Sequence, residues 1–162
     1  MTQASQTRFI SLAQWCALAQ EGLAPPVTIC LEGDSMRPRI RRGLDPVTIV
    51  PLSKPLQRGD VVLFRLGEKH IVHRVWKLRP GMVQTFGDNC WNPEPWFPEN
   101  QVLGQVVTYS RNGKTHRLDT PAARAWGRLW LTIHPARRVC LRLKNLAAKV
   151  VRRLRKEVRK YE

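Results

Sequence analysis

Three short motifs in the first two thirds of the chain carry residue types that together can hydrolyse an amide bond. Residues 33–38 read Gly-Asp-Ser-Met-Arg-Pro, residues 71–75 read Ile-Val-His-Arg-Val, and residues 87–89 read Gly-Asp-Asn. A serine hydroxyl needs a base within hydrogen-bond reach, and a neutral imidazole needs a partner that fixes its tautomer. Ser35, His73 and Asp88 therefore form a candidate nucleophile, base and orienting carboxylate, as in a serine peptidase.

Each of these residues also has an ordinary structural explanation. Gly-Asp-Ser is common in turns, and Asp88 could cap a turn through its own side chain. A lone histidine in a strand is more often satisfied by a backbone carbonyl than used in catalysis. Taken singly, the motifs favour these structural roles, whereas their order and spacing together favour the catalytic one.

The order and spacing also resemble those of the signal peptidase family, which is related to the self-cleaving phage and SOS repressors. The resemblance covers about residues 27 to 110, through motifs at 35–38 (nucleophile), 58–64 (a Gly-Asp-hydrophobic strand), 73–75 (base), 87–89 (last box) and 102–106 (a Gly-x-Val strand). It is nearest to the branch whose base is a histidine. The resemblance implies an endopeptidase that removes a leader or signal segment from a precursor peptide, cutting after small residues.

Lys69 is the rival base, because most bacterial members of this family use a Ser-Lys pair. Lys69 has the same side-chain parity as His73 on the predicted strand, but four residues of strand span about 13 Å, so both cannot reach Ser35. In the lysine branch a serine of the last box orients the amine, and Pro93 occupies the corresponding place here. We therefore expect His73 to be the base.

The tetrahedral intermediate of amide hydrolysis needs hydrogen-bond donors for its oxyanion. We expect the Ser35 N–H to be one donor. Some relatives supply a second donor from a hydroxyl two residues before the nucleophile, where this chain has Gly33. A neighbouring backbone N–H must replace it, or the second donor is missing. We expect Met36 and Pro38 to stiffen the turn by packing.

Hydrophobic periodicity predicts a mainly β fold with an antiparallel core of the signal peptidase and repressor-peptidase type. Strands are predicted at 27–31, 46–50, 60–66, 70–78, 83–86 and 101–110, with hairpin turns at 67–68 and 111–114. Residues 90–98 are predicted to form a loop without strand pairing, because this segment holds three prolines, which lack the N–H that a strand needs for pairing. Its aromatic side chains either cover the core, which we favour, or line a substrate cleft.

Helical periodicity flanks this β region on both sides. A short amphipathic helix is predicted at 9–23, and a helical stretch at 121–130 precedes an apolar stripe at 139–158. A cleavable signal peptide is a weaker reading of 9–23, because Gln14 and Trp15 interrupt the apolar run. The predicted organisation is an N-terminal helical segment at 1–26, a peptidase-like β domain at 27–118, and basic amphipathic helices at 119–162.

The net charge of +16 is concentrated at the end of the chain. Residues 136–162 hold eleven lysines and arginines against two glutamates, so this segment alone contributes +9. A basic amphipathic helix can lie on an anionic membrane surface, or its stripe can pack on the domain with a solvated basic face. Nucleic acid is a less favoured partner, because no recognition motif accompanies the charge.

Cysteines 16, 30, 90 and 140 are scattered, so neither a metal site, another cofactor nor a disulfide framework is expected. No apolar run approaches the 18 to 20 residues of a membrane-spanning helix. We expect a cytoplasmic protein with peripheral contact to the inner face of the membrane and a precursor peptide as substrate. The alternative is a non-enzymatic or self-cleaving repressor-like regulatory module, although the 26 residues before Val27 are few for a recognition domain.

Overall fold

The computed structural model describes residues 11–134 and 136. The chain divides into two compact units, residues 1–128 and residues 129–162, and the β-sheet belongs to the first unit. The apolar stripe predicted at 139–158 and the start of the helix predicted at 9–23 lie outside the described residues.

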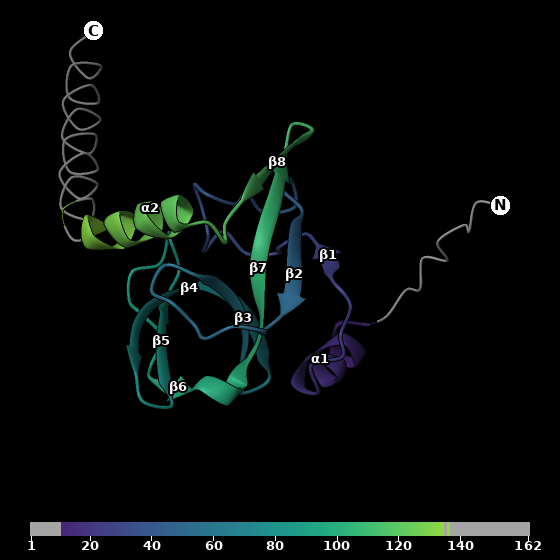
Figure 1. Cartoon of the computed structure of the whole chain (residues 1–162). Helices are drawn as coiled ribbons and strands as arrows, with labels where there is room; N and C mark the ends of the chain where they lie inside the picture. The colour runs from purple at the N-terminus through teal and green to yellow at the C-terminus, as the bar shows by residue number, and fades with distance from the viewer. Residues whose placement is uncertain (1–10, 135, 137–162) are drawn as a thin grey trace, which may run out of the picture. The chain divides into compact units, whose positions relative to one another are not determined.

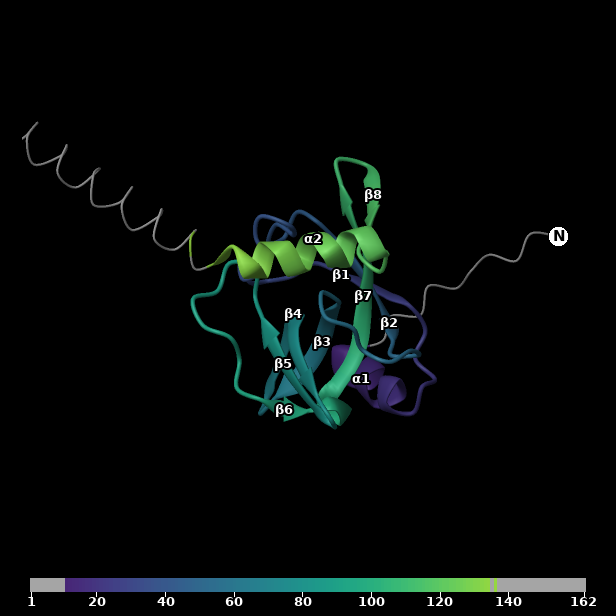
Figure 2. The same ribbon diagram turned by 60° about the vertical axis from the view of Figure 1, so that its left-hand side comes forward.

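The first unit is built on one eight-stranded antiparallel sheet that curls into a half-barrel (Figure 1). Seven strands follow the order β1-β2-β7-β3-β4-β5-β6, and β8 pairs with β7. Figure 2 shows β3, β4 and β5 side by side. The strands are β1 (Val27–Ile29), β2 (Val47–Pro51), β3 (Val61–Leu66), β4 (Lys69–Arg79), β5 (Met82–Phe86), β6 (Phe97–Pro98), β7 (Val102–Arg111) and β8 (Lys114–Arg117).

Strand β3 is buried on both faces from Val61 to Phe64, which explains the uninterrupted apolar run at these four positions. Val61 and Leu63 belong to one hydrophobic cluster, and Val62 and Phe64 belong to another. Because side chains alternate along a strand, β3 separates the two clusters. The first cluster also contains Met36 of the nucleophile turn, so the core reaches the candidate site directly.

Helix α1 (Leu12–Gln20) closes one side of the first cluster. It begins with a capping box, in which Ser11 Oγ accepts from the Gln14 N–H and Gln14 Oε1 accepts from the Ser11 N–H. Trp15 is fully buried and its indole N–H donates to the Pro25 carbonyl at 2.7 Å. This bond ties the helix to the chain that leads into β1.

The mainly β prediction is confirmed, and so are the hairpin turns. Gly67 lies between β3 and β4, and Asn112 and Gly113 between β7 and β8, all with positive φ as tight hairpin turns require. The prediction that residues 90–98 form no strand pairing is wrong at their end. Phe97 pairs with Val83 and Pro98 with Met82, because β6 is an edge strand, where a proline needs no N–H partner on its outer side.

Helix α2 (Pro121–Thr132) extends two residues beyond the predicted stretch. In the first unit its Arg124 Nε donates to Asp60 Oδ1, which also accepts from Gln105 on β7. Asp60 is thereby an anchor for the entrance to β3.

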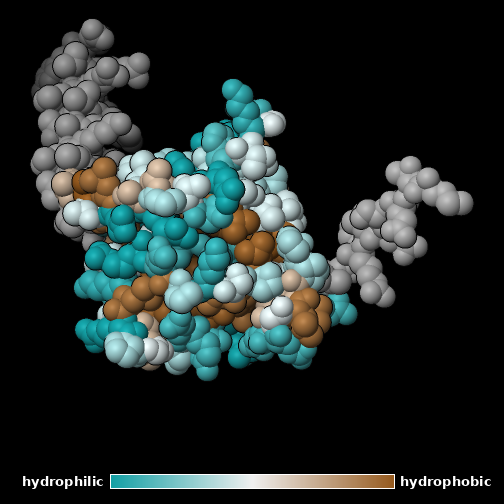
Figure 3. All heavy atoms as spheres, in the orientation of Figure 1, coloured by the Kyte–Doolittle hydropathy of each residue, from teal (hydrophilic) through white to brown (hydrophobic). Residues whose placement is uncertain are grey.

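Among the described residues, no helix combines the length and apolar character needed to cross a bilayer. The face in Figure 3 is mostly hydrophilic, with apolar patches between polar areas.

Candidate active site

The nucleophile turn and the Gly-Asp-Asn motif meet in space. The Asn89 N–H donates to the Ser35 carbonyl at 2.7 Å, and Asn89 Nδ2 donates to the Asp34 carbonyl at 3.3 Å. Two bonds from Asn89 thus hold the carbonyls of the peptide links before and after Ser35. Segments 54 residues apart in the chain are fixed against each other where the sequence motifs predicted a shared site.

Gly87 marks the point where Ser35 and His73 converge. A Cβ atom on Gly87 would lie 2.8 Å from His73 Nε2, 2.9 Å from the Ser35 carbonyl oxygen and 2.5 Å from Cys90 Sγ. These separations are shorter than real Cβ contacts, so only glycine fits. The base nitrogen and the nucleophile backbone therefore surround the same small volume.

His73 is a buried base in an apolar setting. It lies in the middle of β4, is 4% exposed, and its ring centroid is 6.2 Å from that of Phe64. Burial lowers the pKa of His73 to about 4, so the imidazole is neutral at pH 7 and can accept a proton. Lys69, the rival base, begins β4 beside the hairpin turn and is exposed.

The carboxylate that faces His73 is that of Glu94, which the sequence did not single out. Glu94 Oε1 is 3.3 Å from His73 Nδ1, which is within ion-pair distance, but the angle is outside hydrogen-bond geometry. The Glu94 backbone is fixed against β5 by bonds to the Thr85 carbonyl at 2.9 Å and from Gln84 Nε2 at 3.0 Å. In the tautomer that carries its proton on Nδ1, on the side of Glu94, Nε2 is the basic nitrogen.

The expected role of Asp88 as the orienter of His73 needs correction. Its two carboxylate oxygens accept from Arg74 Nε and Nη2, both at 2.8 Å, and both side chains are fully buried. The reason is the alternation of β4: Arg74 points to the opposite face from His73, and Asp88 follows it there. Arg74 also donates to the Gly59 carbonyl at 2.8 Å. Asp88 therefore positions the turn that carries Gly87 and Asn89.

Cys90 is the second residue that sequence reasoning missed. Its Sγ lies 3.7 Å from His73 Nε2, the nitrogen that would activate Ser35. Burial, and then the negative charge of Glu94, raise the pKa of the Cys90 thiol. A protonated thiol is a weak donor to the imidazole and a poor nucleophile.

The backbone N–H of Ser35 is the oxyanion donor that the sequence predicts. Within the described part of the chain, the N–H groups of Ser35 and Met36 donate no hydrogen bond. Met36 is fully buried, so it anchors the turn as expected, while Pro38 is exposed. The Ser35 side chain is half-buried, and its Oγ makes no hydrogen bond to another described residue.

A buried acid supports the chain that follows the nucleophile. Asp45 accepts from Arg41 and from Arg111, and Arg111 also donates to the carbonyls of Pro38 and Arg39. Arg111 ends β7, so these bonds connect the turn to a central strand. The backbone at and after Ser35 is consequently held by two residues, Asn89 and Arg111.

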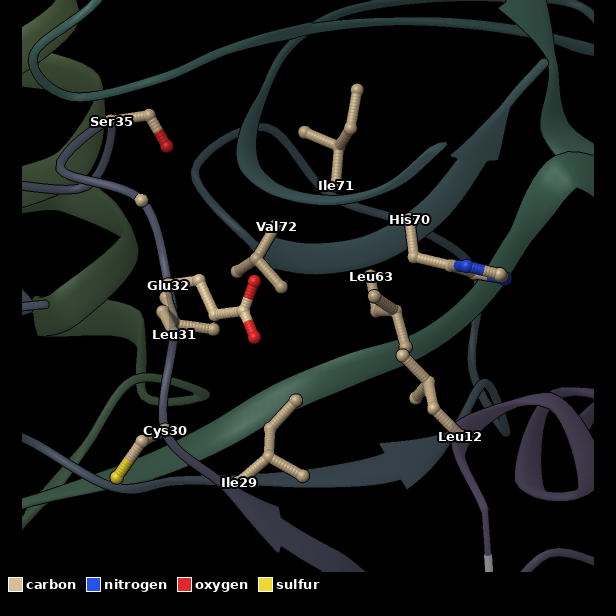
Figure 4. Close-up of a pocket in the computed structure, with 11 residues that line it drawn as sticks. Leu12, Ile29, Cys30, Leu31, Glu32, Ser35, Leu63, His70, Ile71 and Val72 are labelled. Atoms are coloured by element: carbon tan, nitrogen blue, oxygen red, sulfur yellow. The ribbon is translucent and has the colours of Figure 1, made fainter. Parts of the chain in front are cut away.

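Ser35 opens onto a pocket of about 420 Å³ (Figure 4). Its walls come from residues 29–33, which continue from β1, and from residues 70–72 of β4, with Leu63 and Leu12. Most of these side chains are apolar. Because β1 is an edge strand of the sheet, an extended peptide could lie along it and reach Ser35.

The Ser35 carbonyl oxygen and His73 Nε2 both adjoin Gly87, and the Glu94 carboxylate lies 3.3 Å from His73 Nδ1. No family model and no curated protein matches the chain. Little in the sequence distinguishes Glu94 or Cys90 from ordinary loop residues. The sequence offered one signal for these two residues. Both lie in the loop after the Gly87-Asp88-Asn89 motif, and Glu94 is the first acidic residue after Asp88.

Proposed function

We propose that the chain is a serine endopeptidase similar to signal peptidases, which removes a leader or signal segment from a precursor peptide. The observation that carries this proposal is the convergence of the Ser35 backbone and His73 Nε2 around Gly87. The curled antiparallel sheet and the pocket beside Ser35 are compatible with such a peptidase fold. The family assignment itself rests on the sequence motifs.

In the proposed reaction, Ser35 Oγ attacks the scissile carbonyl and His73 Nε2 takes the hydroxyl proton. Glu94 faces the resulting imidazolium through Nδ1, and the N–H groups of Ser35 and Met36 receive the oxyanion. His73 then gives its proton to the leaving amine, which breaks the peptide bond and leaves an acyl-serine. Water, deprotonated by the same imidazole, releases the acid product.

The direct test is cleavage of candidate precursor peptides by the full chain, followed by mass spectrometry. We expect a defined cleavage product from the wild type and none from Ser35→Ala or His73→Ala, with Lys69→Ala retaining most activity. Circular dichroism shows whether the inactive variants are folded. Loss of activity in Lys69→Ala together with its retention in His73→Ala would overturn the choice of base.

A second candidate is a thiol hydrolase with Cys90 as the nucleophile. It is favoured by the 3.7 Å contact between Cys90 Sγ and His73 Nε2. Two observations weigh against it. The pKa of the thiol is raised, and the Cys90 N–H already donates to the Gly87 carbonyl, so it is not available to an oxyanion. Activity that survives in Ser35→Ala and is lost in Cys90→Ala would establish this alternative. A repressor-like module would instead cleave only its own chain.

A further inference from the structure

One wall of the pocket beside Ser35 carries an exposed carboxylate, that of Glu32. Glu32 lines the pocket three residues before the nucleophile, and Figure 4 shows its carboxylate directed into the space between Leu31 and Val72. In the described part of the chain, Glu32 makes no hydrogen bond or ion pair. Its neighbour Asp34, by contrast, is paired with Arg37.

The surroundings of Glu32 combine a long apolar surface with one negative charge. Ile29, Leu31, Leu63, Ile71 and Val72 form most of the wall, and His70 lies at the opposite side in Figure 4. Lysine and arginine have the complementary build, since an apolar stem carries a cationic head. A small neutral side chain would leave most of the 420 Å³ unfilled and Glu32 unpaired.

The charge of the whole protein predicts the opposite preference. With a net charge of +16, long-range attraction favours acidic peptides. Glu32 lies in the pocket itself, within a few residues of Ser35, so it acts on the one substrate side chain that enters there. A preference for a basic residue would therefore come from this local contact and not from the general field.

We propose that Glu32 is a specificity-determining residue that selects precursors with a lysine or arginine beside the cleavage point. This inference rests on the proposed peptidase function, and it assigns the pocket to a basic side chain in place of the small residue that the family resemblance implies. The stem of the basic side chain packs along Leu31 and Val72, and its cationic head pairs with the Glu32 carboxylate.

The test uses peptides that differ at a single position near the scissile bond, which carries arginine, glutamine or glutamate. We expect the wild type to cleave the best arginine peptide about two- to fivefold faster in kcat/KM than its glutamine counterpart, the range for an exposed ion pair. The ratio should fall to about one in Glu32→Gln. In Glu32→Arg the glutamate peptide should become the preferred substrate. Glu21→Gln, which changes the net charge equally at an exposed site on another segment, should keep the wild-type ratio.

Binding measurements separate this inference from the proposed function. Anisotropy of labelled peptides with Ser35→Ala, alone and combined with Glu32→Gln, reports affinity without cleavage. An arginine preference in binding that depends on Glu32, without cleavage by the wild type, would overturn the peptidase function and support the subsite. Cleavage without an arginine preference, or a preference unchanged in Glu32→Gln, would overturn the subsite and leave the peptidase function standing.

Discussion

Replacing Gly87 by alanine perturbs the contact between the nucleophile turn and the base. The added methyl group would lie 2.5 Å from Cys90 Sγ, 2.8 Å from His73 Nε2 and 2.9 Å from the Ser35 carbonyl oxygen. Ordinary contact begins at 3.4 Å, so these three groups must retreat by about 0.9, 0.6 and 0.5 Å. Gly87 has no positive φ that would strain alanine, so the clash is the main effect.

The cost follows from these displacements. Overpacking of this kind destabilises a domain by about 1–3 kcal/mol. Misplacing catalytic groups by around 1 Å can cost on the order of 100-fold in rate, so we expect kcat/KM for a cleaved peptide to fall by about 10- to 100-fold. The Gly87→Ala, Cys90→Ala double variant should recover part of the loss, because it removes Sγ, which makes the shortest contact.

Thermal unfolding and peptide-cleavage kinetics measure the two effects separately. Gly33→Ala is the matched control, because a Cβ there meets nothing closer than Ser35 Oγ at 4.0 Å and φ is not positive. We expect this control to keep the wild-type melting temperature; it serves for stability alone, because Gly33 lines the pocket beside Ser35. Wild-type stability and activity in Gly87→Ala would refute the reasoning, since His73 and Ser35 would then not enclose that point.

Three further perturbations test other parts of the site. Arg74→Met leaves the buried Asp88 carboxylate without its main partner, so denaturant unfolding should show a loss of about 3–5 kcal/mol; a loss below 1 kcal/mol would contradict the bracing role. Glu94→Gln removes the charge that faces the imidazolium while keeping the shape of the side chain. We therefore expect kcat to fall about tenfold or more with little change in KM. An unchanged kcat would remove Glu94 from the proposed reaction. His73 has a folded pKa of about 4 against 6.5 for the unfolded chain, so the unfolded state binds the extra proton between these values. The free energy of unfolding should therefore fall by about 3 kcal/mol as the pH drops from 6.5 to 4, and a His73→Leu variant should lack this part of the loss; equal pH dependence of the two proteins would contradict the burial argument.

The sequence was sufficient to predict six of the eight strands, because their apolar periodicity reflects burial on one or both faces. Strand β3 is the clearest case, since Val61 to Phe64 are apolar at every position and lie between two clusters. Strand β6 was missed because a proline-rich segment is usually unpaired, and only the position at the sheet edge makes Pro98 acceptable. Edge position is a property of the whole sheet and is not visible in a nine-residue window.

The site was predicted in part for a similar reason. Motif order and spacing brought together Ser35, His73 and the Gly87-Asp88-Asn89 turn, which the hydrogen bonds of Asn89 and the packing of Gly87 join. Asp88 was expected to face His73 but pairs with Arg74, because sequence spacing does not tell which face of β4 a following loop will reach. Arg74 takes Asp88 on one face, and Glu94 approaches His73 through a loop whose course depends on its bonds to β5.

The catalytic assignment is tested most directly by comparing kcat/KM of the wild type, Ser35→Ala and Cys90→Ala on the same cleaved peptide. Both candidate nucleophiles adjoin the site. Cys90 must be compared with Ser35 because its Sγ lies 3.7 Å from His73 Nε2. We expect Ser35→Ala to lose at least about 1,000-fold and Cys90→Ala to stay within a few-fold of the wild type. Retained cleavage in Ser35→Ala would contradict the claim that the hydroxyl of Ser35 is the nucleophile.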